Sequence, residues 1–210
     1  MRSTLDTKCR LCRTEGTKLF LKGARCLSSK CPIDKKAGVR PGMHGLKRTK
    51  KLSDFAIQLR AKQQAKRYYG GIMETQFRNY YDKAKLMKGI VGENLLSLLE
   101  RRLDNALYVA GLALSRSHAR SLVSHKQVFV NGKILNIPSY SVKINDEISL
   151  SKKITEKSGD LIKISDKDYK SPDWITVNKT KYSAQVNSLP VVDASISGIN
   201  INLIIEYYSR

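Results

Sequence analysis

The sequence has 210 residues, of which 39 are Lys or Arg and 18 are Asp or Glu, for a formal net charge of +21. Its length allows one sizeable domain or two modest ones, and its hydrophobic fraction of 41% is ordinary for a globular protein. So large a positive surplus destabilises a compact chain by self-repulsion unless a polyanion relieves it. Nucleic acid is the leading partner, because phosphates that a protein neutralises release condensed counterions. No apolar run is long enough for a membrane span, and no signal-peptide stretch opens the sequence, so we expect a cytosolic protein.

The positive charge is concentrated in the first part of the chain. Residues 1–90 hold 23 Lys and Arg against 6 Asp and Glu, whereas residues 91–210 hold 16 against 12. A single charge run is usually a solvated surface, but this density over 90 residues favours a binding surface. An anionic membrane is the competing partner, and it would call for a basic amphipathic helix or a lipid anchor.

All four cysteines lie in the first 31 residues: Cys9, Cys12, Cys26 and Cys31. Two pairs, with two and four intervening residues, are separated by thirteen residues, a spacing typical of four thiolates around one tetrahedral zinc ion. Residues 7–34 hold too few apolar side chains to fold alone, and metal binding can supply about 10 kcal/mol. The alternative is four buried or unpaired thiols, since disulfides do not suit a reducing compartment.

A basic connector and a helix follow the cysteines. Residues 39–51 carry Pro-Gly and Gly punctuation with several cations near their end, which predicts an extended loop. Ser53 can cap a helix that runs to about Tyr68, and Asp54 in its first turn suits the helix dipole. At spacings of three and four, the predicted buried face of this helix consists of Phe55, Ala56, Leu59 and Gln63.

Three further helices are predicted over residues 74–88, 93–110 and 116–125. Glycines stop the first two, and Ser115 can cap the third. Within the second, Arg101 and Asp104 are predicted to form an intrahelical ion pair. The residues expected to be buried are Phe77, Tyr81, Ala84, Leu95, Leu96, Leu99, Leu103, Ala106, Leu107, Ala119, Leu122 and Val123.

The hydrophobic period then changes to two, which predicts strands. Residues 128–130 and 133–135 form a predicted hairpin, in which Asn131 and Gly132 supply the positive φ angles of a type I′ turn. Residues 142–150 predict another pair of short strands, and residues 200–207 predict a strand near the C-terminus. The mixture of helices and strands predicts the α+β class.

Residues 102–148 (RLDNALYVAGLALSRSHARSLVSHKQVFVNGKILNIPSYSVKINDEI) resemble the S-four RNA-binding domain. Relatives of that module occur in pseudouridine synthases, a heat-shock RNA-binding protein and tyrosyl-tRNA synthetases, so the flanking segments decide. The segments RPGMHG (40–45), QFRN (76–79), PDW (172–174) and IEYYSR (205–210) are similar to the bacterial-type family of small-subunit ribosomal protein S-four. The cysteine pairs match the zinc-bearing subset of that family.

The resemblance implies a zinc-bound N-terminal arm over residues 1–45 and a helical RNA-binding domain over residues 46–92. It also implies an S-four-type domain over residues 93–171, in which helices pack on a small antiparallel sheet and RNA lies over the second helix and the adjoining strand. Residues 172–210 form a C-terminal segment, part of which is expected to join the helical domain.

The resemblance also implies a structural constituent of the small ribosomal subunit. Such a protein is a primary binder of the small-subunit ribosomal RNA, nucleates subunit assembly and contributes to translational accuracy. Its implied partners are that RNA, neighbouring small-subunit proteins and messenger RNA at the channel entrance, and its implied location is the cytoplasmic small subunit, with no membrane.

No catalytic arrangement is evident, so we do not expect an enzyme. The sequence has no supported Ser, His and carboxylate set and no phosphate-binding Gly loop. A pseudouridine synthase that used this module for targeting would need a separate catalytic domain, for which the length leaves no room. A zinc-dependent DNA-binding regulator is the second rival, and binding to a folded junction RNA compared with duplex DNA at matched salt would separate the two.

The candidate RNA contacts are mostly cations. His44, in a Gly-flanked basic loop, is predicted to contact phosphate or ribose, or else to be an exposed bystander. Arg116 and Arg120 are one helical turn apart and could straddle successive phosphates, or lie on a solvated face. The tyrosines at 68 and 69 could stack on bases, but core packing is an equal alternative. The full predicted set is Arg10, Arg13, Lys22, Arg40, His44, Lys47, Arg48, Lys50, Lys51, Arg60, Lys62, Lys66, Arg67, Arg78, Arg116, Arg120, His125 and Lys126.

Two positions depart from the pattern that the resemblance implies. Lys126 stands where the family usually has Gly, at the end of the helix predicted over residues 116–125. A left-handed cap there costs about 1 kcal/mol for a residue with a Cβ. Either the turn differs here, or a new cation at the RNA face offsets the strain. Met73 stands where the family tends to have Ser, so the helix over residues 74–88 is expected to start differently.

Overall fold

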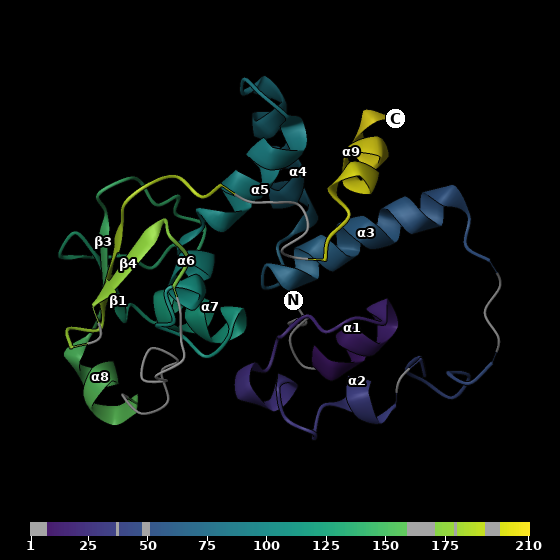
Figure 1. The fold of residues 1–210 in the computed structure, drawn as a ribbon, viewed down its shortest axis with the longest axis horizontal. Helices are drawn as coiled ribbons and strands as arrows, with labels where there is room; N and C mark the ends of the chain where they lie inside the picture. The colour runs from purple at the N-terminus through teal and green to yellow at the C-terminus, as the bar shows by residue number, and fades with distance from the viewer. Residues whose placement is uncertain (1–7, 37, 48–50, 159–170, 179, 192–197) are drawn as a thin grey trace. The chain divides into compact units, whose positions relative to one another are not determined.

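The computed structural model describes residues 8–36, 38–47, 51–158, 171–178, 180–191 and 198–210. The chain divides into two compact units, Met1–Asn94 with Asp193–Arg210, and Leu95–Val192. The first is helical where it is described and the second combines helices with one antiparallel sheet, which confirms the α+β class (Figure 1). No helix in the described ranges combines the length and apolar character that crossing a bilayer requires.

The cysteine-bearing part of unit 1 contains three short helices that the sequence did not predict. These are α1 (Lys8–Glu15), the 3-10 helix η1 (Gly23–Cys26) and α2 (Pro32–Lys35). Their shared apolar cluster is small, because only Cys12, Leu19 and Leu21 are buried in it. Loops and sulfur atoms therefore account for much of this region's interior.

The rest of unit 1 consists of α3 (Asp54–Tyr68), α4 (Glu74–Leu86) and α9 (Ile201–Ser209). Ser53 caps α3 as predicted, because its hydroxyl accepts a hydrogen bond from the Ala56 N–H at 3.4 Å. α9 packs on α3, and in Figure 1 it is the yellow helix beside it.

The strand predicted over residues 200–207 is wrong, because this segment forms α9. The Asn200 side chain accepts a hydrogen bond from the Leu203 N–H, which caps the helix. Ile201 and Ile204 are buried at a spacing of three, which places them on one helical face. A run rich in Ile and Tyr favours a strand locally, and packing against α3 overrides that preference.

The predicted buried face of α3 is also wrong. The buried residues are Gln58, Ala61, Lys62 and Ala65, whereas Phe55 is 49% exposed. Two polar residues can occupy this face because glutamates from other helices of unit 1 pair with them. The face predicted for α4 is confirmed, since Phe77, Tyr81 and Ala84 are buried.

Unit 2 does not contain the single helix predicted over residues 93–110. The chain forms α5 (Val91–Glu100) and α6 (Leu103–Val109), with a break at Arg101 and Arg102. Arg102 is extended and pairs with Ser141 in an isolated bridge. Beyond it, the Leu103 N–H donates to the Tyr140 carbonyl at 2.8 Å. A loop 35 or more residues later therefore forms hydrogen bonds with backbone groups that would otherwise continue the helix. The leucines that were predicted to be buried are nevertheless buried.

α7 (Arg116–Ser124) is confirmed, and Ser115 caps it by accepting a hydrogen bond from the His118 N–H at 3.2 Å. The short helix α8 (Lys152–Ser158) was not predicted.

The sheet has five strands in the order β2-β1-β3-β5-β4, all antiparallel. The hairpin turn is confirmed, since φ is +51° at Asn131 and +75° at Gly132. Of the two strands predicted over residues 142–150 only the second forms, and two later strands were not predicted. The strands are β1 (Val128–Val130), β2 (Lys133–Ile134), β3 (Glu147–Leu150), β4 (Ile175–Asn178) and β5 (Ser183–Val186).

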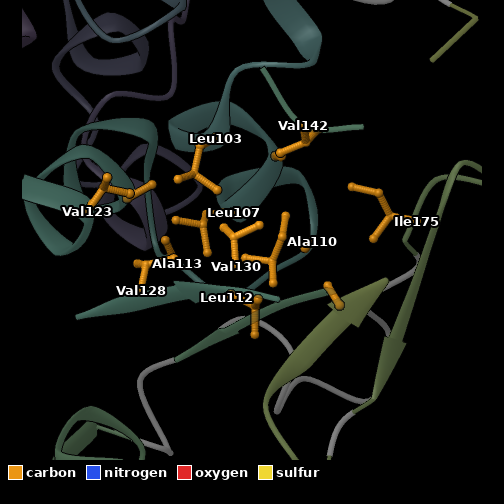
Figure 2. Close-up of a cluster of buried hydrophobic side chains, with 14 of the residues drawn as sticks. Leu103, Leu107, Ala110, Leu112, Ala113, Val123, Val128, Val130, Val142 and Ile175 are labelled. Atoms are coloured by element: carbon orange, nitrogen blue, oxygen red, sulfur yellow. The ribbon is translucent and has the colours of Figure 1, made fainter. Parts of the chain in front are cut away.

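The core of unit 2 lies between the helices and the sheet. Figure 2 shows Leu103, Leu107 and Val123 directed towards Val128 and Val130 of β1. These five side chains are at most 4% exposed. This core anchors α7, so the outward face of that helix is set by well-packed neighbours.

Candidate functional site

The four cysteines line one small pocket in unit 1. Cys9 and Cys12 are three residues apart on α1, which places both sulfurs on the same face of that helix. Cys26 ends η1, and Cys31 precedes the Pro that begins α2. Three of the four are buried, Cys9 is half-buried, and all are free thiols.

Backbone hydrogen bonds and burial act in opposite directions on the thiols of this pocket. The Lys22 N–H donates a hydrogen bond to the Cys26 sulfur at 3.4 Å. Burial raises the pKa of the Cys12 thiol, a backbone hydrogen bond from Leu19 opposes this, and the other three sulfurs raise the pKa further. Within the described residues, however, no three Cys, His, Asp or Glu side chains meet the arrangement that a bound metal ion requires. Four thiols are the donor set of a structural zinc site, but their arrangement does not by itself show one, so zinc stays a prediction.

Lys62 of α3, a predicted RNA contact, is instead part of the interior of unit 1. It is 4% exposed, its Nζ lies 2.7 Å from Glu74 Oε1, and the same Nζ lies 4.0 Å from the centre of the Tyr207 ring. Its prediction as an RNA contact is therefore wrong. Lys66, also predicted, is half-buried and lies 2.7 Å from the other oxygen of Glu74.

Glu74 joins three helices through one carboxylate. Besides the two lysines of α3, it accepts a hydrogen bond from the Tyr208 hydroxyl of α9 at 2.7 Å. Burial alone would raise the pKa of this carboxyl, but the three hydrogen bonds outweigh burial and lower that pKa to about 2. Burial and the hydrogen bond to Glu74 raise the pKa of Tyr208. The charge of Glu74 is therefore an element of the fold of unit 1.

Other arginines among the predicted RNA contacts form hydrogen bonds or ion pairs within unit 1. Arg13 donates from Nε to the Val39 carbonyl at 3.1 Å and from Nη2 to the Arg40 carbonyl at 2.9 Å. Arg60 donates to the Thr14 carbonyl at 3.3 Å, and Arg67 forms an ion pair with Glu15. The two tyrosines that follow Arg67 pack inside unit 1: Tyr69 is 1% exposed, and Tyr68 packs on the apolar cluster that contains Cys12.

In unit 2, Arg116 is 6% exposed, which contradicts its prediction as a surface contact on α7. Its Nε donates to Asn105 Oδ1 at 2.7 Å, and its guanidinium lies 4.5 Å from the centre of the Tyr108 ring. The predicted pair of Arg101 and Asp104 is also wrong, because Arg102 pairs with Asp104 at 2.7 Å. Arg116 thus links α7 to α6, whereas the pair of Arg102 and Asp104 lies at the start of α6, and the outward face of α7 is left to other residues.

The end of α7 does carry exposed predicted contacts. His125 and Lys126 are exposed, and Lys126 has φ of +58°, so of the two alternatives the turn is the left-handed one. Arg120 is half-buried, and one of its Nη atoms is buried with no hydrogen-bond partner in the described residues. At the start of α4, Met73 makes no side-chain capping bond.

The predicted contacts thus fall into four groups by exposure. Buried are Lys62 and Arg116; half-buried are Arg13, Arg40, Arg60, Lys66, Arg67 and Arg120; exposed are Arg10, Lys22, His44, Lys47, Lys51, Arg78, His125 and Lys126; and Arg48 and Lys50 lie outside the described residues.

A network near the hairpin was missed by sequence reasoning. Asp146 is 6% exposed and accepts hydrogen bonds from Asn131 Nδ2 at 2.8 Å, from the Tyr140 hydroxyl at 3.3 Å and from the Lys143 N–H at 2.8 Å. It fixes the turn that presents Lys133, which is exposed. The available signal was an Asp in a turn preceding a strand, a common motif with many roles.

Two family models match the chain. The ribosomal protein S4/S9 N-terminal domain matches residues 4–100, and the S4 domain matches residues 101–148.

Similar proteins match over nearly the whole chain. The small ribosomal subunit protein uS4 of Caldicellulosiruptor saccharolyticus is 49% identical over 212 residues, 100% of both chains. Those of Magnetococcus marinus and Desulfotalea psychrophila are 46% and 45% identical over 211 residues, covering 98% and 100% of both chains respectively. Identity this high over the full length is far more specific than a shared module, and the chain belongs to the family of small ribosomal subunit protein uS4.

Proposed function

We propose that this chain is a structural constituent of the small ribosomal subunit and a primary binder of its ribosomal RNA. The observation that carries the proposal is identity of 45–49% over the full length to proteins named as small ribosomal subunit protein uS4. The net charge of +21 supports it, because a polyanion neutralises that surplus. The chain works by binding and positioning, as expected of a non-catalytic member of this family.

The exposed cations of the two units supply the RNA contacts in this proposal. Arg guanidinium groups such as those of Arg10 and Arg78 form forked hydrogen bonds to phosphate oxygens, and exposed lysines add point charges. A chain that binds ribosomal RNA through two units brings separate RNA segments together, which nucleates subunit assembly. Contacts with neighbouring subunit proteins and with messenger RNA at the channel entrance, and a contribution to translational accuracy, complete the proposed role.

The test is to identify the RNA that copurifies with the chain. Tagged chain expressed in a bacterium should enrich small-subunit ribosomal RNA, and purified chain should bind that RNA more tightly than duplex DNA at matched salt. Equal affinity for the two nucleic acids would instead support a DNA-binding regulator. Enrichment of another RNA class would contradict the proposal.

We further propose that Cys9, Cys12, Cys26 and Cys31 hold one zinc ion. Their shared pocket, their burial and the N–H donor to Cys26 support this. When bound, zinc would link α1, η1 and α2, and would supply free energy that the small apolar cluster of this region lacks.

Elemental analysis of chain purified without added metal should show close to one zinc per chain. Replacing Cys31 by Ser should reduce the bound zinc, whereas replacing exposed Ser29 by Ala should not. A zinc content near zero in the unmodified chain, or disulfides within the cluster, would contradict this assignment.

A further inference from the structure

A groove in unit 2 belongs to none of the interactions described above. It has a volume of about 340 Å³ and lies between α7 and α8. One wall is a face of α7 and its C-cap, because Ser121 and Leu122 each lie three or four residues from both His118 and His125. Lys153 and Ile154 of α8 form part of the opposite wall.

The groove has an apolar floor and a polar rim. Leu122 is buried in the core of unit 2 and Ile154 packs against that core, so the floor is fixed in place. Gln127 also lines the groove, but its carboxamide is already engaged, because it donates to the His125 carbonyl at 3.1 Å and accepts from the Ser151 hydroxyl at 2.6 Å. The rim therefore interacts with a ligand mainly through its imidazoles and Lys153.

The two imidazoles give the groove an aromatic, hydrogen-bonding character. His118 Nδ1 accepts a hydrogen bond from the Leu114 N–H at 3.4 Å, so the neutral ring carries its proton on Nε2. His125 is exposed at the end of α7. Lys153 is exposed on α8, and none of the described residues that line the groove is acidic.

These features suit one ligand class. An unstacked RNA base has apolar faces and a polar edge, and proteins recognise such bases by stacking on aromatic rings, including histidine. A groove of this volume is at the lower limit of small-ligand sites, which suits a single base better than a peptide segment. Lys153 adds a cation where the phosphate of the same nucleotide would lie.

We propose that this groove binds one extruded nucleotide of the small-subunit RNA, with its base against Leu122, Ile154 and the His125 imidazole and its phosphate beside Lys153. The proposal rests on the proposed function, since it assigns a nucleotide subsite within that RNA interface. It gives α7 a role in reading a particular unpaired position, beyond general attraction to phosphates.

A matched pair of substitutions tests the groove. Ser121 and Ser124 are both exposed on α7, but only Ser121 lines the groove. Ser121→Phe fills the groove, and its affinity for small-subunit RNA should fall roughly 5- to 150-fold, the range found for losing one base stacked on an aromatic ring. The slope of its log affinity against log salt should fall by about 0.7 to 0.9 at most, because only the one phosphate beside Lys153 is lost with the base. Ser124→Phe should bind within about twofold of the unmodified chain.

Chemical probing of the RNA bases in each complex locates the nucleotide. One unpaired base should be protected by the unmodified chain and by Ser124→Phe, and should become reactive with Ser121→Phe. His125→Ala truncates the ring without filling the groove, so it should expose the same base and guards against misfolding of the Phe variant.

Equal RNA affinity of the two Phe variants, or unchanged base reactivity with both Ser121→Phe and His125→Ala, would overturn the proposal. So would a Ser121→Phe chain that binds RNA normally but no longer takes up a neighbouring ribosomal protein, which would assign the groove to a protein side chain. Failure of the unmodified chain to bind small-subunit RNA would instead overturn the proposed function, and the two failures are thereby distinguished.

Discussion

The cysteine-bearing segment, residues 8–36, and the module built from α6, α7 and the sheet fold by different means. The module buries 18 apolar residues in one cluster, whereas the cysteine-bearing segment buries three, one of which is a cysteine. A large cluster stabilises a fold through apolar burial alone. The small cluster buries far less apolar surface, so we expect this segment to need the link between its sulfurs that the proposed zinc ion would supply. The difference thus predicts a self-sufficient module beside a segment whose order depends on a ligand.

Breaking the sulfur site should have the largest effect. Cys12→Ser removes a buried cysteine of the proposed zinc site, and structural zinc contributes about 10 kcal/mol in small metal-dependent folds. Hydrogen exchange should accelerate throughout residues 8–36 and stay slow in the sheet of unit 2. Leu27→Ser is the control, because Leu27 is 73% exposed. Unchanged exchange in Cys12→Ser would show that the small apolar cluster suffices.

Breaking the module requires a core cavity. Leu107 of α6 is fully buried, so Leu107→Ala should destabilise unit 2 by about 2 to 5 kcal/mol, as measured by urea unfolding of that unit. Ile134→Ala, at a position 56% exposed, should have little effect. A loss of less than about 1 kcal/mol in the free energy of unfolding of Leu107→Ala would contradict the claim that apolar burial stabilises the module.

The turn after α7 tests whether a strained backbone lowers the stability of the module. Lys126 has φ of +58°, so Lys126→Gly should raise the free energy of unfolding by about 1 kcal/mol, as measured by thermal unfolding. Lys126→Ala keeps the Cβ and should bring no such gain. Both variants remove the cation, so an equal loss of RNA affinity in both would assign that loss to the charge. Equal stability of the Gly and Ala variants would refute the strain.

The smallest expected effect concerns the ionic junction of α3, α4 and α9. The pKa of folded Glu74 is lowered from 4.5 to about 2, so its contribution to stability is complete above 4.5 and is lost as the pH falls towards 2. The side chain is 44% exposed, which limits the contribution to at most about 1 kcal/mol. Glu74→Gln should remove that part of the acid dependence of unfolding, and Asp82→Asn, an exposed carboxyl on the same helix, should keep it. An unchanged acid profile in Glu74→Gln would contradict the role of the junction.

Sequence reasoning succeeded where a structure depends on near neighbours. The caps at Ser53 and Ser115 and the turn at Asn131 and Gly132 are set by residues within three or four positions, and all were predicted. At Lys126 the sequence left two alternatives, a different turn or a left-handed one, and φ of +58° shows the left-handed turn.

Sequence reasoning failed where a segment far away in the sequence determines whether a residue is buried or where a helix ends. Lys62 looks like a surface cation until α9, more than 130 residues later, covers it with Tyr207. Arg116 looks like a phosphate contact until Asn105 and Tyr108 enclose it. The break between α5 and α6 depends on carbonyls at Pro138 and Tyr140. For the candidate site, residue type was therefore predictable and exposure was not, because exposure is a tertiary property.

The placement of α9 has a consequence for the order in which the protein is made. α3 and α4 leave the ribosome first, but α9 follows only after the whole of Leu95–Val192 has been translated. At ordinary elongation rates, that delay lasts roughly 5 to 20 seconds. During it Lys62 and Glu74 lack Tyr207 and Tyr208, while unit 2 can already fold. A nascent chain thus has its whole sheet module translated before its helical unit can close, and a chain broken off before α9 leaves α3 without that packing partner.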